Sequence, residues 1–481
     1  MTGLGAQIET IRTLQTYELV GTVAAVRGMA IYIDDLPAPI GSLVRFDERR
    51  PGMNSVRPIA AADSTGRGAE QASVRPEAAT ERSRHGEVIG FDGTRSIVML
   101  FGTTEGVAPG TEVVCERSAQ TVGVSESLLG RVIDGLGRPI DGRPAPIDCT
   151  ARPLDPPPTG ALQRRRITEP LPTGVRVIDS MVTVGKGQRL GIFSGPGVGK
   201  STLMATVARN TSADVSVLAL VGERGREVRE FIEESLGPDG LSRSVVVVST
   251  GDESPLLRVR ASLVACSVAE YFRDSGADVL LMMDSLTRLA QAQRQIGLTV
   301  GEQPATKGYT PSVFAMLPRL LERAGAVEGS GSITGFYNVL VEGDDLTEPI
   351  ADAARSVLDG HLVLSRRLAS RGHFPAVDLL ESVSRVADAV CDEAHREARR
   401  MITRLVAAWQ EAEELITIGA YAHGSNPDCD VAIALKPRID AFLRQEIQER
   451  SEYPRTCRAL IELADAAVKE FSKRAAKGPS S

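Results

Sequence analysis

A glycine-rich segment near the middle of the chain carries residue types that can bind phosphate. Residues 191–202 read Gly-Ile-Phe-Ser-Gly-Pro-Gly-Val-Gly-Lys-Ser-Thr, so an apolar run gives way to a tight turn and then to a Lys-Ser pair. Backbone N–H groups in such a turn point at phosphate oxygens, Lys200 can reach the β- and γ-phosphates, and the Ser201 hydroxyl suits Mg²⁺. Ser194 replaces the glycine that usually begins this pattern, which is a small departure. We call residues 194–202 the phosphate loop and expect it to bind the phosphates of a nucleoside triphosphate through Gly195, Pro196, Gly197, Val198, Gly199, Lys200, Ser201 and Thr202.

Two acidic residues beyond the phosphate loop follow apolar runs of strand type. Asp284 ends the run Val-Leu-Leu-Met-Met-Asp at residues 279–284, and an acid at such a strand end can hold Mg²⁺ through water. Glu223 follows another apolar run and is our candidate for the base that orients an attacking water. Arg224 and Glu227 belong to the same short charged segment and could complete the site. These residues and the phosphate loop supply the phosphate site, metal, water and cations that triphosphate hydrolysis requires.

Strand-type and helix-type segments alternate around these residues. Apolar runs at 215–221, 245–249 and 279–283 have strand length and are separated by helical stretches such as 256–272. This alternation is typical of a parallel sheet covered by helices, and such sheets bind ligands at the carboxyl ends of their strands. We therefore expect an α/β domain whose phosphate loop and two acids lie at one edge of the sheet.

The flanking regions have different patterns. Short β-branched runs broken by glycine and proline fill residues 18–118 and predict a small β-barrel. Apolar positions near helical spacing in residues 1–20 favour a helix docked on this domain. Residues 48–85 lack the apolar content that offsets ordering entropy, so we expect a disordered insert there. The expected domains are a β-barrel at 1–118, an α/β domain at 119–385 with a linker at 143–172, and a helical domain at 386–481.

Composition narrows the class of protein. The chain has 481 residues, with 55 Lys and Arg against 62 Asp and Glu, and the net charge of −7 argues against broad nucleic-acid binding. The cysteines include no C-x-x-C pair, which favours a reducing compartment, and we find no apolar run of about 18 residues that could span a bilayer. We expect a cytoplasmic protein. The basic run Arg164-Arg-Arg166 is expected to be a solvated surface segment.

Several of these segments together resemble one protein family. Residues 173–179 (Thr-Gly-Val-Arg-Val-Ile-Asp), the phosphate loop, the strand through Asp284 and residues 375–385 (Pro-Ala-Val-Asp-Leu-Leu-Glu-Ser-Val-Ser-Arg) resemble the rotary-ATPase relatives of RecA. Residues 222–228 (Gly-Glu-Arg-Gly-Arg-Glu-Val) and 419–425 (Gly-Ala-Tyr-Ala-His-Gly-Ser) resemble the ATPases of bacterial flagellar and virulence type III protein export. The resemblance implies an N-terminal β-barrel, a central RecA-like P-loop ATPase domain and a C-terminal helical domain, assembled as a homohexameric ring with nucleotide between subunits.

The resemblance also implies roles for single residues. Glu223 would polarise the attacking water, and Arg224 would approach the γ-phosphate. Tyr309 would lie near the nucleotide, and Arg385 would reach the γ-phosphate held by a neighbouring subunit. A guanidinium supplied in this way makes hydrolysis depend on the subunit interface and is worth about 10³ to 10⁵ in rate. Lys200 completes the implied catalytic set, and the implied residues around the metal are Ser201, Asp284 and Glu227.

The function that the resemblance implies is ATP hydrolysis with Mg²⁺ by a motor that energises type III protein export, releasing chaperones and unfolding substrates. We expect the flagellar system first, because residues 36–41 (Leu-Pro-Ala-Pro-Ile-Gly) resemble that branch, and an injectisome ATPase is the alternative. The implied partners are stalk and negative-regulator proteins, chaperone–substrate complexes and the export gate. The protein would meet that gate from the cytoplasm, at the inner membrane.

Three further functions would use some of the same residues. The catalytic subunit of a rotary ATP synthase needs the same loop, Glu and Arg, but residues 222–228 and the export-type C-terminal segment argue against it. An RNA-translocating RecA-like hexamer needs a basic, aromatic-bearing barrel surface, and aromatic residues are only 4% of this chain. A non-catalytic nucleotide-binding subunit can lose the water-positioning carboxylate, which this chain keeps as Glu223. The choice between export systems, the cargo, the oligomeric state in isolation and the role of residues 48–85 stay open from the sequence.

Overall fold

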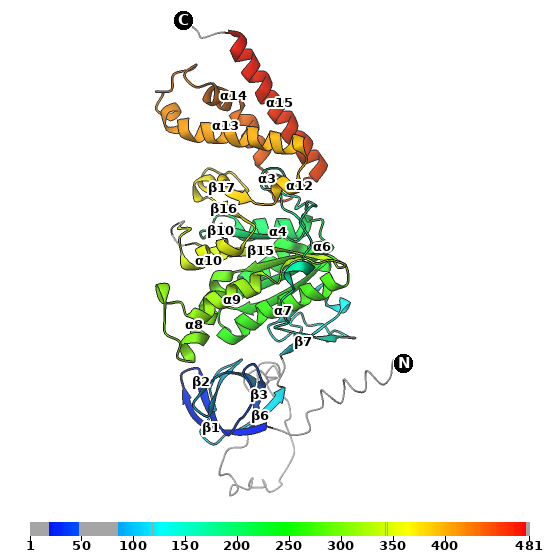
Figure 1. Ribbon diagram of the computed structural model, residues 1–481, viewed down its shortest axis with the longest axis vertical. Helices are drawn as coiled ribbons and strands as arrows, with labels where there is room; N and C mark the ends of the chain where they lie inside the picture. Colours follow the sequence, from blue (N-terminus) through cyan, green and yellow to red (C-terminus); the bar gives the residue numbers. More distant parts are fainter. Residues whose placement is uncertain (1–18, 48–84, 118–119, 342, 344, 478–481) are drawn as a thin grey trace, which may run out of the picture.

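Three parts follow one another along the long axis of the molecule (Figure 1). A β-barrel lies at one end, a large sheet with helices on both faces lies in the middle, and long helices form the other end. The helix expected in residues 1–20 and the insert expected at 48–85 fall outside the described residues, apart from Leu19, Val20 and His85, which belong to strands. The computed structural model describes residues 19–47, 85–117, 120–341, 343 and 345–477.

The first six strands close into a barrel. They pair antiparallel in the order β1-β2-β5-β4-β3-β6, and the last strand returns to the first. Inward-facing apolar residues such as Val23, Ile31, Val44 and Val88 fill its interior. Closure leaves none of these six strands with a free edge. The strands are β1 (Leu19–Arg27), β2 (Ala30–Asp34), β3 (Leu43–Phe46), β4 (His85–Asp92), β5 (Arg95–Leu100) and β6 (Glu112–Arg117).

The central sheet is mostly parallel. Its strands follow the order β17-β16-β10-β15-β13-β11-β12-β8, with β14 paired to β15, and only β17 and β14 run antiparallel to a neighbour. Every residue of β11 is buried, as expected for a parallel strand covered on both faces. The strands are β8 (Arg131–Asp134), β10 (Arg189–Ser194), β11 (Val215–Glu223), β12 (Ser244–Thr250), β13 (Asp278–Asp284), β14 (Gly325–Ala326), β15 (Ser332–Leu340), β16 (Gly360–Leu364) and β17 (Val377–Ser384), and β7 (Thr121–Val124) pairs separately with β9 (Thr150–Pro153).

Helices cover both faces of this sheet. Along β11, Val217 packs into the core beneath α7, whereas Leu218 packs into the core beneath α4, because successive side chains point to opposite faces. The strands predicted at 215–221, 245–249 and 279–283 and the helix predicted at 256–272 are confirmed as β11, β12, β13 and α7. The helices of this part are α3 (Arg176–Met181), α4 (Lys200–Asn210), α5 (Gly225–Glu230), the π-helix η3 (Phe231–Leu236), α6 (Gly237–Ser242), α7 (Pro255–Asp274), α8 (Leu286–Thr299), α9 (Pro311–Leu321), α10 (Pro349–Val357) and α11 (Arg366–Ser370), with short turns η1 (Glu126–Leu128), η2 (Ala161–Gln163) and η4 (Thr306–Gly308).

The helical end of the molecule is fastened to the central part. Gln445 is buried between them: its Oε1 accepts a hydrogen bond from the Arg176 N–H at 2.6 Å, and its Nε2 donates to the Gly174 carbonyl at 2.8 Å. Apolar residues at helical spacing, including Ile402 and Leu405, join the same core as the sheet. The helices are α12 (Ala387–Val390), α13 (Glu393–Thr417), α14 (Pro427–Leu443) and α15 (Tyr453–Lys477).

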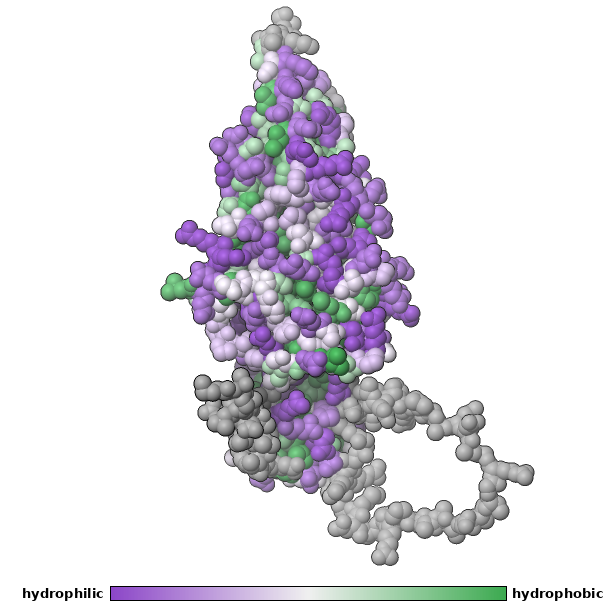
Figure 2. Space-filling model, turned by 90° about the vertical axis from the view of Figure 1, so that its right-hand side faces the viewer, coloured by the Kyte–Doolittle hydropathy of each residue, from purple (hydrophilic) through white to green (hydrophobic). Residues whose placement is uncertain are grey.

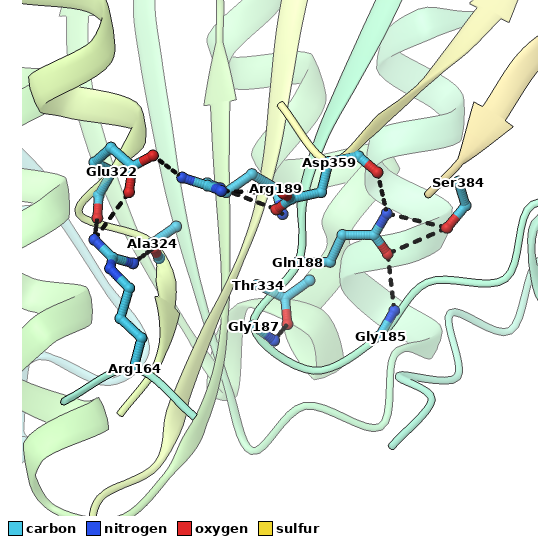
Figure 3. Close-up of polar contacts among 10 residues, drawn as sticks. All are labelled: Arg164, Gly185, Gly187, Gln188, Arg189, Glu322, Ala324, Thr334, Asp359 and Ser384. Atoms are coloured by element: carbon cyan, nitrogen blue, oxygen red, sulfur yellow. Dashed lines mark hydrogen bonds and ion pairs between the residues drawn. The ribbon is translucent and has the colours of Figure 1, made fainter. Parts of the chain in front are cut away.

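A polar network ties together the amino ends of β10 and β16 (Figure 3). Gln188 Nε2 donates to the Asp359 carbonyl and to the Ser384 hydroxyl, both at 3.1 Å. The Asp359 carboxylate accepts two hydrogen bonds from the Arg189 guanidinium, at 2.9 and 3.0 Å. This bidentate pair uses both carboxylate oxygens of Asp359.

The expectation that the basic run at 164–166 is solvated is wrong for Arg164. Its guanidinium donates to the Ala324 carbonyl at 3.1 Å and to the Glu322 carbonyl at 2.6 Å, and it lies 3.0 Å from the Glu322 carboxylate (Figure 3). The reason is that the last carbonyls of a helix lack partners within it, and Glu322 follows the last residue of α9. Arg165 and Arg166 are exposed, as expected.

On the face drawn in Figure 2, hydrophilic side chains dominate and hydrophobic ones form small scattered groups. No helix in the described part of the chain has the length and apolarity that a bilayer span requires.

Candidate active site

The phosphate loop connects strand β10 to helix α4. Gly197 and Gly199 have φ angles of 77° and 89°, which glycine adopts without strain. No atom lies within 4 Å of the place where a Cβ on Gly197 would stand, so the turn has open space on that side. Ser194 is buried at the end of β10, where the chain turns. The loop thus combines a turn that can approach a phosphate closely with the N-terminus of an 11-residue helix.

Lys200 lies between two buried carboxylates. Its Nζ is 2.5 Å from Asp284 Oδ1 and 3.7 Å from Glu223 Oε1, and none of the three side chains is more than 12% exposed. The acids meet because β11 and β13 are parallel neighbours, with Leu220 opposite Asp284 in the register. The prediction that Glu223 and Asp284 reach the phosphate loop at one sheet edge is confirmed.

Glu223 has the most perturbed surroundings of these groups. Burial and the neighbouring Asp284 carboxylate raise its pKa, against the opposing effect of the Lys200 and Arg288 cations. Its Oε2 lies 2.7 Å from Arg288 Nη1. Its Oε1 is buried and accepts no hydrogen bond from any residue that the structure describes. A buried acceptor in this state is stabilised when water or a ligand supplies the missing donor.

Arg288 is a site residue that the sequence analysis missed. It lies in the first turn of α8 and donates to the Gly222 carbonyl at 2.6 Å, next to its contact with Glu223. Gly222 has a φ of 75°, and a Cβ there would stand 2.9 Å from Arg288 Cδ, so this position requires glycine. One feature of the sequence could have indicated it: Arg288 is a cation four residues after Asp284, just beyond the end of the same strand.

A cavity of about 420 Å³ opens beside the phosphate loop. One wall is apolar, and the ring of Phe374 lies 3.6 Å from where a Cβ on Gly199 would stand. Its walls come from segments far apart in the sequence, so nothing local could have predicted it. The lining residues are Val175, Gly197, Val198, Gly199, Thr202, Leu203, Thr206, Leu364, Gly372, Phe374, Pro375, Ala376, Arg444, Gln445, Glu446 and Ile447.

Arg224, Glu227 and Tyr309 have other surroundings. The Arg224 side chain is 71% exposed and lies 3.4 Å from Glu227, and no ion pair within the described ranges joins either residue to Lys200. Tyr309 packs edge-on against Phe314 with ring centroids 6.3 Å apart, and it is not among the residues that line the cavity. Among the described residues, Arg224 and Glu227 thus form no ion pair with the Lys200 cluster, and Tyr309 lies outside the cavity lining.

Arg385 lies at the opposite edge of the sheet. β17 runs antiparallel to β16, and its last residue, Ser384, pairs with Gly360 at the start of β16. β16 is parallel to β10, whose carboxyl end carries the phosphate loop. The separation is about the length of a six-residue strand, roughly 20 Å. One protomer cannot bring Arg385 to its own phosphate loop.

Oxygen donors at the loop suit a hard divalent cation. Among the described residues, no three His, Cys, Asp or Glu side chains gather into a metal centre. Ser201 is exposed and is the second residue of α4, and the Asp284 carboxylate ends β13 at the same sheet edge. Mg²⁺ is usually held by one or two such protein oxygens together with water and phosphate oxygens, so this donor set fits it.

The fold and the site together define a class of protein. A parallel sheet, a glycine-rich loop between strand and helix, and a lysine between two strand-end acids are the parts of a P-loop nucleoside triphosphatase of RecA type.

Comparison with known proteins agrees with this class and narrows it. The nucleotide-binding domain of the ATP synthase alpha/beta family matches residues 174–384, its beta-barrel domain matches 66–116, and the T3SS EscN ATPase C-terminal domain matches 391–462. A flagellum-specific ATP synthase of Treponema pallidum is 47% identical over 95% of this chain and 96% of its own. The SPI-2 type 3 secretion system ATPase of Salmonella typhimurium is 52% identical over 76% of this chain and 81% of its own.

A solved structure shares the fold. The assembled ATPase EscN of the enteropathogenic E. coli type III secretion system has a TM-score of 0.80 and 39% identity, covering 92% of this chain and 100% of that one. EscN has also been solved in complex with its central stalk, EscO. The chain belongs to the flagellar and type III secretion export ATPases of the ATP synthase alpha/beta family.

Proposed function

We propose that copies of this chain assemble into a hexameric ring that hydrolyses Mg²⁺-ATP to energise flagellar protein export. The observation that carries the chemical part is the buried Glu223 carboxylate, which keeps one oxygen without a hydrogen-bond donor beside Lys200.

The triphosphate would bind on the phosphate loop, with the base in the adjoining cavity. Lys200 is held between Asp284 and Glu223, so its ammonium is already fixed at the loop when phosphate arrives. The cavity beside Phe374 has the size and the apolar wall that a nucleoside needs. Tyr309, which the family resemblance places near the nucleotide, would contact it only from outside this cavity.

Ser201 and Asp284 would hold Mg²⁺, with Glu227 supporting its water shell. Held there, Mg²⁺ would supply neutralisation of the phosphate charge. The residues of this chain do the rest. Lys200 meets the phosphate charge, and the turn at Gly197 and Gly199 leaves the backbone open to the phosphates.

Glu223 would orient the attacking water through its free Oε1. Its pKa is raised, so this carboxylate is more basic than an ordinary glutamate and better suited to accept a proton. Arg288 holds the other oxygen at 2.7 Å and fixes the direction in which Oε1 points. Arg224 would turn from its exposed position towards the γ-phosphate.

Arg385 would complete the site of a neighbouring copy. The sheet separates it from its own phosphate loop, so a role at the γ-phosphate requires a second subunit. The solved EscN assembly and its complex with the stalk EscO support a ring around a stalk.

In the cell, the ring would work in the cytoplasm at the inner-membrane export apparatus. Stalk and negative-regulator proteins, chaperone–substrate complexes and the export gate would be its partners, and the ring would release chaperones and unfold substrates. The flagellum-specific relative that matches 95% of the chain supports flagellar export. The SPI-2 relative keeps an injectisome as the second candidate. Deleting the gene in its own bacterium should stop flagellin export and motility, whereas loss of injectisome secretion alone would favour the second candidate.

Replacing Glu223 tests the catalytic proposal. Glu223→Gln keeps the size of the side chain but removes the basic oxygen, so ATP binding should persist within about threefold while Mg²⁺-dependent hydrolysis falls by about 10² to 10⁴. The measurements are phosphate release and equilibrium binding of ATP by the purified full chain. Glu233→Gln, at a residue 58% exposed on η3, is the matched control and should hydrolyse ATP normally. Hydrolysis at the normal rate by Glu223→Gln would contradict the proposal.

A further inference from the structure

A second cavity, of about 210 Å³, lies at the amino edge of the sheet and is lined by three basic side chains. Arg355 comes from the last turn of α10, His361 from β16, and Arg385 follows β17. Three separate elements therefore direct basic groups to one small space. Ser356 and the backbone around Gly360 supply further polar groups.

The acids near this cavity do not neutralise its two guanidinium groups. Both carboxylate oxygens of Asp359 accept hydrogen bonds from Arg189 (Figure 3). Asp352 also lines the cavity, but among the residues that the structure describes no ion pair joins Asp352, or any other acid, to Arg355 or Arg385. Two neighbouring cations without an anion repel each other, so this arrangement is stabilised when an anion enters.

His361 is the third basic side chain that lines this cavity. Burial, followed by the nearby Arg355, lowers its pKa, so the imidazole is neutral at pH 7. Its ring packs edge-on against Phe193 with centroids 5.6 Å apart. Phe193 belongs to β10, the strand that leads into the phosphate loop, so one side chain that lines this cavity packs against that strand.

The backbone that carries Arg385 is held firmly. Its N–H donates to the Asp359 carbonyl at 2.9 Å. The preceding residue, Ser384, donates to the Thr183 carbonyl at 2.8 Å and accepts from Gln188 at 3.1 Å. The network of Figure 3 therefore holds the backbone next to Arg385 in place, while Arg385 itself stays exposed.

We infer that this cavity is a phosphate site for a nucleotide bound by another copy of the chain, and that Arg355 is a second cation for that phosphate beside Arg385. The inference rests on the proposed function, because it needs two copies to meet edge to edge. Two guanidinium groups can share the oxygens of a terminal phosphate, each donating more than one hydrogen bond in a fixed plane. Arg355 would thus be a catalytic residue of the neighbouring site.

The first test compares Arg355→Ala with Arg366→Ala, an exposed arginine on α11 that is not part of the cavity lining. In assembled protein, Arg355→Ala should lower kcat by about ten- to a hundredfold, the scale of a lost charged hydrogen bond, with little change in ATP binding to the phosphate loop. Arg355→Lys should recover part of the rate, since it restores the charge but not the planar fork. Trapping of ADP with aluminium fluoride should weaken in parallel. An Arg355→Ala protein that matches Arg366→Ala in rate and trapping overturns the inference.

The second test asks whether Arg355 acts on another copy. Rings that mix Arg355→Ala with Glu223→Gln contain interfaces where an intact phosphate loop meets an intact cationic edge, so part of the activity should return. Rings that mix Arg355→Ala with Arg385→Ala damage the same edge in every copy and should stay at or below the reduced rate of Arg355→Ala alone. Recovery in the second mixture, or none in the first when its composition is verified, would show that the two arginines do not serve one neighbouring site.

The outcomes separate this inference from the proposed function. If Arg385→Ala keeps the full rate, the site shared by two copies is wrong and the inference fails with it. If Arg385→Ala loses activity while Arg355→Ala does not, the proposed function stands and only the role of Arg355 fails. Sedimentation of each variant with nucleotide checks that assembly itself is retained.

Discussion

Lys200 has two acidic neighbours with unlike surroundings, and the difference fits different tasks. Asp284 is the more buried and lies 2.5 Å from the ammonium, so its charge is engaged by a cation. Glu223 lies farther away and keeps a buried oxygen without a donor. Both carboxylates touch a cation, since Glu223 Oε2 lies 2.7 Å from Arg288, but an oxygen without a donor, such as Glu223 Oε1, is free to hold a water. This contrast supports Asp284 as the metal residue and Glu223 as the base.

Replacing Asp284 should therefore weaken the binding of Mg²⁺ and so reduce ATP hydrolysis. Asp284→Asn removes the negative charge near Lys200 and the proposed Mg²⁺ position, so hydrolysis should fall by about two orders of magnitude or more, the scale of losing several kcal/mol of charge stabilisation. Phosphate release measured across Mg²⁺ concentrations checks this. Asp278→Asn, at the other end of the same strand, is the control and should retain the rate. Normal turnover by Asp284→Asn at low Mg²⁺ would remove Asp284 from the metal site.

Part of the site could be predicted from residue types alone. The phosphate loop, Glu223 and Asp284 stand at strand ends that the sequence marks, and the structure brings them together. Arg288 needed one further step, since it lies one turn beyond Asp284. The exposed position of Arg224 is decided by its contact with Glu227 and by solvent, which no local pattern records.

The direction of β17 decides whether one protomer can bring Arg385 to its own phosphate loop. Apolar runs predicted strands and helices well because burial on both faces leaves a strong pattern, as in β11. Strand direction leaves no such pattern, because an antiparallel edge strand and a parallel one can have the same residues. The position of Arg385 far from its own phosphate loop followed only from the pairing of β17 with β16.

The segment after α14 joins the helical end of the molecule to the cavity beside the phosphate loop. Gln445 lines that cavity and makes hydrogen bonds to Arg176, Gly174 and Glu449. Gln445→Leu would leave buried backbone groups without partners, so we expect a loss of about 2 kcal/mol or more in unfolding free energy and weaker ATP binding. Thermal unfolding with and without ATP measures both effects. Arg438→Ala, at an exposed residue of α14, should change neither, and an unaltered Gln445→Leu would show that this contact is unimportant.

A buried acid, Glu87, joins the barrel to the central part of the molecule. Glu87 of β4 lies 3.7 Å from Arg260 of α7 and accepts a hydrogen bond from Gln120. Burial raises the pKa of Glu87 from 4.5 to about 7, and the Arg260 and Gln120 contacts only partly oppose it. The folded protein therefore binds this proton more tightly than the unfolded chain does.

The sign of the resulting pH effect is fixed by that pKa. Between pH 4.5 and about 7 the folded state holds more protons, so Glu87 should make unfolding free energy fall as pH rises, by up to about 3 kcal/mol, and level off above pH 7. Glu87→Gln should remove this part of the slope. The comparison is the difference in melting temperature between the two proteins from pH 5 to 8. A difference that stays constant with pH would contradict the raised pKa.

The two halves of the proposed active site occupy opposite edges of one sheet, and this restricts the symmetry of any productive assembly. Neighbours must meet through unlike surfaces, which is a heterologous contact rather than a twofold one. An open row then has an unused phosphate loop at one terminus and an unused pair of arginines at the other. Two chains in contact would form one complete pocket, at about half of their phosphate loops. Only closure of the row into a ring would complete the pocket at the last phosphate loop. Specific activity would thus report ring closure itself.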